Sequence, residues 1–123
     1  MKLNVVELPA SRQKDPGKQR DEESMRMLDA LKKLEGDVWI LDETGERMKS
    51  QEFSFLLSQA RDAGRSLIFV LGGAYGLSAD VKKRGQGRLR LSDMTFPHEL
   101  CRVVFLEQLY RGCEILRGSG YHH

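Results

Sequence analysis

The sequence predicts an α/β domain with a mainly parallel sheet and helices on both of its faces. Short apolar segments alternate with segments of helical periodicity, in the order strand then helix, four times along the chain. Residues 66–71 (SLIFVL) are apolar at successive positions, which is typical of a parallel strand covered on both faces. A chain of 123 residues has room for one core, so we expect a single domain over residues 1–123.

The first third of the chain is expected to form a strand, a loop and a helix. Residues 3–8 (LNVVEL) contain two adjacent valines and precede a proline, which predicts a strand. Residues 10–20 are polar and aperiodic and contain Pro16-Gly17, which predicts a mobile loop. Residues 21–34 have apolar side chains at helical spacing, acids in the first turn and lysines in the last, which predicts a helix.

The middle of the chain should contain a strand, a turn and a second helix. Residues 37–41 (DVWIL) predict a short buried strand, and residues 42–45 a turn. Ser50 is the expected N-cap of a helix that ends at Gly64. The apolar face of that helix repeats at i, i+3, i+4 and i+7 and consists of Phe53, Leu56, Leu57 and Ala60.

The last helix, from Pro97 to about Arg117, has apolar residues on nearly every side. Such a helix must be covered on two sides, and in a small domain the second cover is most simply another copy of the chain. We therefore expect a homodimer through this helix, with full burial in a monomer as the alternative. Before it we expect a turn over 72–76, a helix over 78–83, a strand over 88–91 and a loop over 93–96.

Composition excludes several classes of protein. Twenty Lys plus Arg against 18 Asp plus Glu gives a net charge of +2, too small for a protein that coats nucleic acid. No apolar run reaches the roughly 20 residues that span a bilayer, and the start lacks a signal peptide, so we expect a cytoplasmic protein without a membrane segment. Cys101 and Cys113 lie about 18 Å apart along the last helix and are interpreted as reduced, half-buried thiols.

Two local basic segments stand out from this nearly neutral background. Residues 11–20 hold four basic residues and one acid, and residues 82–90 hold five basic residues and no acid. They indicate a phosphate-bearing partner, and ordinary solvated loops are the alternative interpretation.

A ligand site is expected beyond the carboxyl ends of the parallel strands, where open α/β sheets bind their ligands. The pair Gly72-Gly73 follows the most apolar strand and lets a ligand approach the backbone, although a bare structural turn is the alternative. Neither the phosphate-loop motif nor the dinucleotide fingerprint is present, which favours a flat, mostly uncharged ligand such as an adenosine derivative.

Metal and hydrolase chemistry have little support in the sequence. His98 and Cys101, three residues apart, cannot complete a zinc site alone, so we expect no metal. A nucleophile elbow (G-x-S-x-G) is missing, which disfavours a hydrolase. The chain ends in Gly-Ser-Gly followed by Tyr121, His122 and His123, for which a frayed tail is the alternative to a functional segment.

Several motifs together resemble one known family. They are residues 68–78 (IFVLGGAYGLS), 91–98 (LSDMTFPH), 99–111 (ELCRVVFLEQLYR) and the ending Gly120-Tyr121-His122. Their order and spacing are similar to the ribosomal RNA large subunit methyltransferase H family, over roughly residues 4–123. The resemblance implies a SPOUT-class enzyme with a C-terminal trefoil knot, acting as a homodimer. It also implies S-adenosylmethionine as cofactor and methylation of N3 of a pseudouridine in 23S ribosomal RNA on the ribosome.

The same resemblance implies which residues form the site. Arg111, Tyr121 and His122 match positions near the transferred methyl group, with His122 as candidate proton acceptor and Arg111 as the cation that stabilises the anion. The residues expected to bind the cofactor are Leu41, Gly72, Gly73, Ser92, Asp93, Met94, Thr95, Phe96 and Pro97.

Two departures from the family pattern and two other interpretations accompany this hypothesis. Family members usually begin with an extra strand and helix before the segment that matches residues 4–10. The second departure is local: Ala74-Tyr75 in the glycine turn, where other members also vary, and His123 where the family often has a basic residue. The other interpretations are a catalytically impaired, knotted RNA- or ribosome-binding module that retains the cofactor pocket, and a small-ligand sensor.

Overall fold

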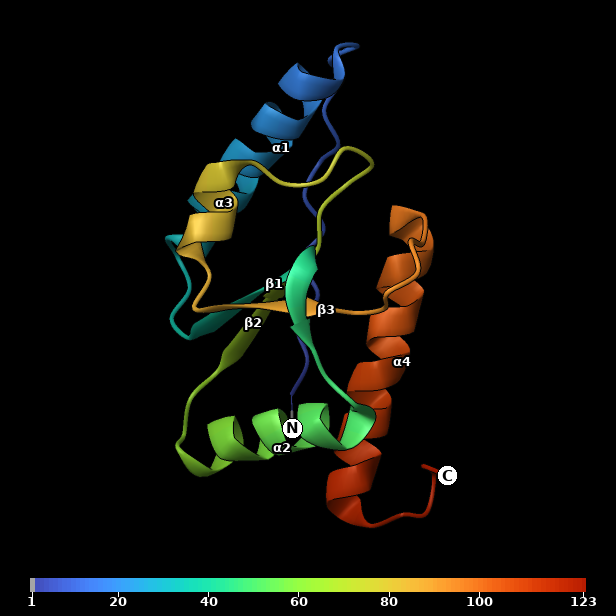
Figure 1. The fold of residues 1–123 in the computed structure, drawn as a ribbon. Helices are drawn as coiled ribbons and strands as arrows, with labels where there is room; N and C mark the ends of the chain where they lie inside the picture. The colour runs from blue at the N-terminus through green and yellow to red at the C-terminus, as the bar shows by residue number, and fades with distance from the viewer. Residues whose placement is uncertain (1) are drawn as a thin grey trace.

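A computed structural model describes residues 2–123 and shows a three-stranded sheet with helices on both faces (Figure 1). The strand order is β2-β1-β3, and both pairings are parallel, which confirms the predicted fold class. The elements are α1 (Pro16–Leu31), β1 (Asp37–Arg47), α2 (Ser50–Asp62), β2 (Leu67–Val70), α3 (Ala79–Arg84), β3 (Gly87–Arg90) and α4 (His98–Arg117).

Alternation along β1 divides the core between the two faces of the sheet. Val38 and Ile40 are completely buried in a cluster with side chains of α1 and α3. Trp39 and Leu41 pack on the opposite side, against a cluster formed by α2, β3 and α4. In that second cluster the rings of Phe53, Phe69 and Phe105 lie with centroids 4.9–6.0 Å apart.

The strand predicted over residues 3–8 is wrong. This segment pairs with no strand, and Leu3, Val5 and Val6 are exposed. The chain that follows is instead fastened to α1, where Arg26 donates to the carbonyl of Pro9 at 2.8 Å. Adjacent valines favour an extended backbone, but only a neighbouring strand can supply its hydrogen bonds.

The loop predicted over residues 10–20 is correct only as far as residue 15. Asp15 caps α1, with Oδ2 accepting from the amide of Lys18 at 2.9 Å, and Pro16 is the first helical residue. Asp followed by Pro is a strong start signal, because the carboxylate satisfies a free amide and the ring fixes φ at a helical value. The helix also ends earlier than predicted, at Leu31.

The turn predicted over residues 42–45 is also wrong, because β1 continues through this segment to Arg47. Both Leu41 and Glu46 pair with Leu89, so residues 42–45 bulge out of the ladder. A Cβ on Gly45 would lie 2.7 Å from the backbone of Leu89, which explains why the bulge contains a glycine.

The remaining elements agree with the sequence to within a few residues. Residue 49 rather than 50 is the N-cap of α2, where the amide of Lys49 donates to Glu52 Oε1 at 2.9 Å. Ser78, expected as the first residue of α3, is its N-cap, and α4 is followed by Gly118, which has a left-handed φ of 66°. Cys101 and Cys113 both lie in α4 and are half-buried, as predicted.

Helix α4 is covered by its own chain on one side. Phe105 is buried there, and Ser54 of α2 donates to the carbonyl of Gly112 at 2.9 Å. The other side carries an apolar stripe of exposed residues: Leu100, Val103, Leu106 and Tyr110. The alternative prediction, that the helix is fully buried within one copy, is therefore wrong.

Candidate functional site

The carboxyl edge of the sheet is apolar. Leu41 belongs to β1, Leu71 directly follows β2 and Leu91 directly follows β3. All three are half-buried and pack against the cluster that contains Phe53 and Phe105. This edge offers a partly uncovered apolar surface, which suits a flat ring system such as adenine.

The predicted glycine turn is tight and is supported by α1. The amide of Gly76 donates to the carbonyl of Gly73 at 3.1 Å. A Cβ on Gly72 would lie 3.0 Å from the Leu77 side chain, and one on Gly73 only 2.7 Å from Glu23 Oε1. A side chain at Gly72 would crowd Leu77 and the Gly76 backbone at 3.2 Å, whereas one at Gly73 would have to displace the carboxylate of Glu23.

In the segment from Ser92 to Pro97, Asp93 is held by two arginines and the next residue, Met94, is exposed. Asp93 Oδ1 accepts from Arg47 Nε and from Arg90 Nη1, each at 3.0 Å. The hydrogen bond from Arg90 is the main reason that the pKa of Asp93 lies below its ordinary value, and Arg47 adds to it. The side chain of Met94 is 76% exposed, so it is available to cover a ligand.

These residues fit an adenosine-bearing cofactor. The apolar edge can take the ring, the glycine turn is only half-buried, and the exposed Met94 side chain can cover a ligand. Within residues 2–123 one buried side-chain polar atom lacks a partner, Nε of Arg90, at the β3 end of the same region. An acceptor brought to this end of β3 would satisfy that donor.

The three residues expected near the transferred methyl group lie together. Arg111 Nη1 contacts His122 Nδ1 at 3.0 Å, and the guanidinium lies 4.8 Å from the centroid of the Tyr121 ring. Glu107 joins them, because its Oε1 accepts from Arg111 Nη2 at 2.7 Å and from the Tyr121 hydroxyl at 3.2 Å. We call Glu107, Arg111, Tyr121 and His122 the tail cluster.

Electrostatics in the tail cluster favour the ion pair between Arg111 and Glu107. The hydrogen bond from Arg111 is the largest influence on Glu107 and holds the pKa of its carboxyl below the ordinary value. The same bond raises the pKa of Arg111. The cluster therefore holds a fixed cation beside the His122 ring.

The contacts of His122 determine which ring nitrogen carries its proton. A guanidinium can only donate, so Nδ1 must be the acceptor toward Arg111. The neutral ring then has its proton on Nε2, which lies 3.0 Å from the Gln51 side-chain amide. The Gln51 atom at this distance is its amide nitrogen Nε2, so Gln51 can accept there only with its amide turned to bring the oxygen to the ring.

The sequence did not single out two members of this neighbourhood. Glu107 and Arg111 are spaced i, i+4 on α4, so the pairing of Glu107 could have been predicted from helical geometry. Gln51, on α2, carries no such signal, because its contact with His122 spans 71 positions of sequence.

The tail cluster lies far from the glycine turn in one copy of the chain. Figure 1 shows the turn in the upper half, beside α1 and α3, and the C-terminus at the lower end, beside α2. Along α4, Arg111 lies about 20 Å below Pro97 at 1.5 Å per residue. One copy therefore does not bring the two halves of the predicted site together.

The two basic segments differ in how much of their charge is neutralised. Lys82 and Arg88 contact Asp42 at 3.3 and 3.8 Å, directly beyond the apolar edge. Burial raises the pKa of Asp42, but the hydrogen bond from Thr44 and the charge of Lys82 outweigh it, so the net pKa is lowered. Within the two basic segments, five exposed cations form no ion pair with any of the described residues: Arg12, Lys14, Lys18, Lys83 and Arg84.

Residues 2–123 contain neither a metal cluster nor a helix that could span a membrane. In this range no group of three or more His, Cys, Asp or Glu side chains is placed to hold a metal ion. None of the helices in the same range is long and apolar enough to cross a membrane.

The fold and these two regions together define a class: an α/β domain with an adenosine-compatible edge and a separate polar cluster on its last helix. A family profile described as "Predicted SPOUT methyltransferase" matches residues 1–122. Curated relatives give the finer assignment. Ribosomal RNA large subunit methyltransferase H of Oleidesulfovibrio alaskensis is 45% identical over 109 residues, covering 88% of this chain and 70% of the relative.

Two further relatives carry the same name. That of Geotalea daltonii is 44% identical over 105 residues, covering 85% of this chain and 68% of the relative. That of Flavobacterium johnsoniae is 41% identical over 121 residues, covering 98% and 73%. The chain belongs to the ribosomal RNA large subunit methyltransferase H family of SPOUT methyltransferases.

Proposed function

We propose that this protein transfers the methyl group of S-adenosylmethionine to N3 of a pseudouridine in 23S ribosomal RNA, as a knotted, cytoplasmic homodimer that acts on the ribosome. Family membership supports methyl transfer to ribosomal RNA. The observation that carries the assignment of residues is the tail cluster, in which Arg111, Tyr121 and His122 come together although the tail lacks secondary structure.

The cofactor would lie at the carboxyl edge of the sheet. Leu41 and its apolar neighbours take the adenine, and the turn at Gly72 and Gly73 meets the methionine part. The proposed knotted loop wraps the cofactor with Ser92, Asp93, Met94, Thr95, Phe96 and Pro97. S-adenosylmethionine supplies a methyl group on a sulfonium, so the main task of the protein is alignment.

The tail cluster would manage the proton and charge on the nucleobase. N3 of pseudouridine carries an imide proton that must be lost before nitrogen can attack the methyl carbon. Arg111 can stabilise the resulting anion through a uracil oxygen. When Arg111 turns to that oxygen it releases the Nδ1 lone pair of His122, which then accepts the proton.

Other residues of the cluster would position these two groups. Glu107 binds both Arg111 and the Tyr121 hydroxyl, so it fixes the guanidinium relative to the aromatic ring. With its amide oxygen turned toward the ring, Gln51 would accept from His122 Nε2 and so hold the tautomer with a basic Nδ1. Both act through a neighbour and are positioning residues.

A second copy would bring the two halves together. The turn and the tail cluster lie at opposite ends of one copy, and α4 carries an uncovered apolar stripe between them. Pairing of two stripes buries this apolar surface and can place the tail of one copy at the cofactor edge of the other. The exposed cations of the two basic segments would then bind phosphates of the RNA.

Calorimetry and a methylation assay test this proposal. We expect S-adenosylmethionine to bind the purified protein, and the protein to methylate ribosomes that lack the modification. Absence of cofactor binding contradicts the proposal. Binding without transfer favours the impaired RNA-binding module, and transfer that survives both Arg111→Ala and His122→Ala contradicts the assigned roles.

A further inference from the structure

The carboxylate of Glu23 lies against the glycine turn without a cation to neutralise it. A Cβ on Gly73 would be 2.7 Å from Glu23 Oε1, so this oxygen touches the turn at the residue proposed to meet the cofactor. Glu23 is half-buried and forms no ion pair among residues 2–123. Its negative charge is therefore not neutralised by an ion pair, although it lies partly buried beside a proposed ligand site.

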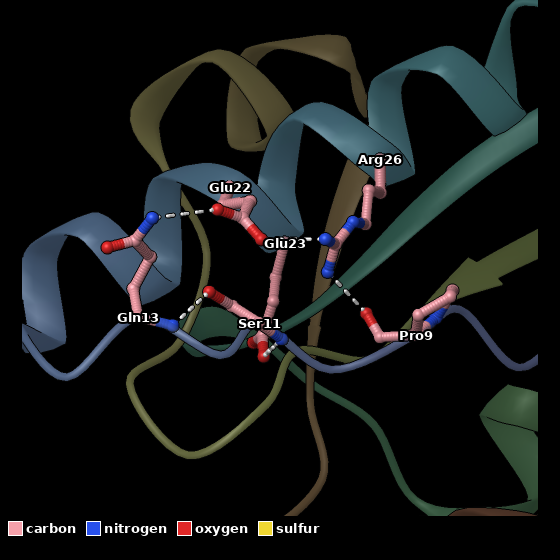
Figure 2. Close-up of polar contacts among 6 residues, drawn as sticks. All are labelled: Pro9, Ser11, Gln13, Glu22, Glu23 and Arg26. Atoms are coloured by element: carbon pink, nitrogen blue, oxygen red, sulfur yellow. Dashed lines mark hydrogen bonds and ion pairs between the residues drawn. The ribbon is translucent and has the colours of Figure 1, made fainter.

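The orientation of this carboxylate is fixed by the backbone of the N-terminal segment. Ser11 is buried, and its amide donates to Glu23 Oε2 at 2.9 Å, which leaves Oε1 directed toward the turn. Figure 2 shows Glu23 reaching toward Ser11, while the adjacent Glu22 contacts Gln13 and Arg26. Only the second of these two neighbouring acids is therefore available to the turn.

The next residue of α1 holds the far end of the same turn. Ser24 is 2% exposed, and its hydroxyl oxygen accepts from the amide of Ser78 at 3.0 Å. Glu23 and Ser24 thus contact the segment from Gly73 to Ser78 at both ends. These contacts, together with the hydrogen bond from Ser11, fix the position of the Glu23 carboxylate relative to the turn.

We propose that Glu23 is a further cofactor-binding residue, which recognises the positive charge of the methionine part of S-adenosylmethionine. This inference rests on the proposed function, because it places the cofactor at Gly73. The methionine part carries a sulfonium and an ammonium group, both cations, and Glu23 Oε1 is a fixed anion at the turn that would meet them. In a partly desolvated site such a pair contributes to affinity and weakens as salt rises.

Isothermal titration calorimetry with Glu23→Gln tests the proposal without measuring methyl transfer. Glutamine has the same shape and can still accept from the Ser11 amide, so the change removes mainly the charge. We expect S-adenosylmethionine to bind about fivefold more weakly, with the difference from wild type shrinking at high salt. The matched control is Glu22→Gln, which removes the neighbouring charge on the other side of Ser11 and should leave the affinity unchanged.

Parallel titrations with S-adenosylhomocysteine, which lacks the sulfonium charge, identify the group that Glu23 recognises. A loss only with S-adenosylmethionine supports the sulfonium, and an equal loss with both ligands supports the ammonium. Unchanged affinity in Glu23→Gln, or an equal loss in Glu22→Gln, overturns the proposal. Failure of the wild type to bind either ligand contradicts the proposed function instead, and thermal unfolding of each variant verifies that it is folded.

Discussion

The glycine turn and the tail cluster are built in different ways. Three of the five residues of the turn are glycines, and its first two glycines pack closely against Leu77 and Glu23. The tail cluster consists of side chains that hold one another by charge and hydrogen bonds, with Arg111 at its centre. A packed backbone suits the binding of a cofactor, whereas a polar network can move protons and charge, in keeping with the proposal that the turn binds and the tail cluster carries the chemistry.

Removal of the central cation should give the largest effect and separates the two tasks. We expect Arg111→Ala to lower the rate of methyl transfer by about 100- to 1,000-fold, because the anion loses its stabilising charge. Cofactor affinity, measured by calorimetry, should stay close to that of wild type. Arg117→Ala, near the exposed end of the same helix, is the control and should remain active. An equal loss of cofactor binding in Arg111→Ala would break the division of tasks.

Disruption of the apolar stripe tests whether the two regions need a second copy. We expect Val103→Glu to produce a 14.0 kDa monomer in light scattering, because a charge would be buried at the centre of the contact. Methyl transfer should fall by about 100-fold if each site needs both copies. Arg61→Glu, on the exposed surface of α2, is the control. A fully active monomer would contradict the dimer.

A methyl group added to the turn should have a smaller effect, limited to binding. In Gly73→Ala the new Cβ meets Glu23 Oε1 at 2.7 Å, so either the carboxylate or the turn must shift. We expect the dissociation constant for S-adenosylmethionine to rise about tenfold, measured by calorimetry, with the dimer intact. Gly17→Ala is the matched control, since its Cβ would meet only Asp15 Oδ2 at 3.3 Å. Unchanged affinity would remove the turn from the site.

The smallest expected effect concerns Asp42, which lies beyond the apolar edge and pairs with Lys82 and Arg88. We expect Asp42→Asn to lower the free energy of unfolding by about 2 kcal/mol near pH 7, measured by denaturant titration. Because its pKa is lowered in the folded state, wild type keeps this contribution above the ordinary value of 3.8 and loses it as pH falls through the lower folded value. A difference that persists in acid would contradict the charge-based explanation.

Local signals in the sequence predicted much of the fold. The helical face with Phe53 and Leu57, the parallel apolar strand β2 and the end of α4 at Gly118 follow from periodicity and capping, which involve near neighbours. The start of α1 was also predictable, since Asp15-Pro16 is a strong capping pair that the polar composition around it concealed. The bulge at Gly45 was not, because it depends on contact with Leu89.

The sequence predicted the candidate-site residues that belong to sequence motifs, but not those that only tertiary packing brings close. Arg111, Tyr121 and His122 came from the family resemblance, and their proximity in the structure supports the grouping. Gln51 lies 71 positions from its partner His122, and Glu23 lies 50 positions from Gly73. Neither residue belongs to a local sequence pattern that would indicate a site. Such contacts arise from the packing of α1 and α2 on the rest of the chain.

Complementation between two inactive variants tests the central claim, that a turn from one copy works with a tail from the other. One chain carries Gly73→Asp and the other Arg111→Ala, and the two are co-expressed and assayed for methyl transfer. Random pairing makes half of the dimers mixed, each with one intact composite site, so we expect about a quarter of wild-type activity. Activity no higher than that of either variant alone would show that turn and tail act within one chain.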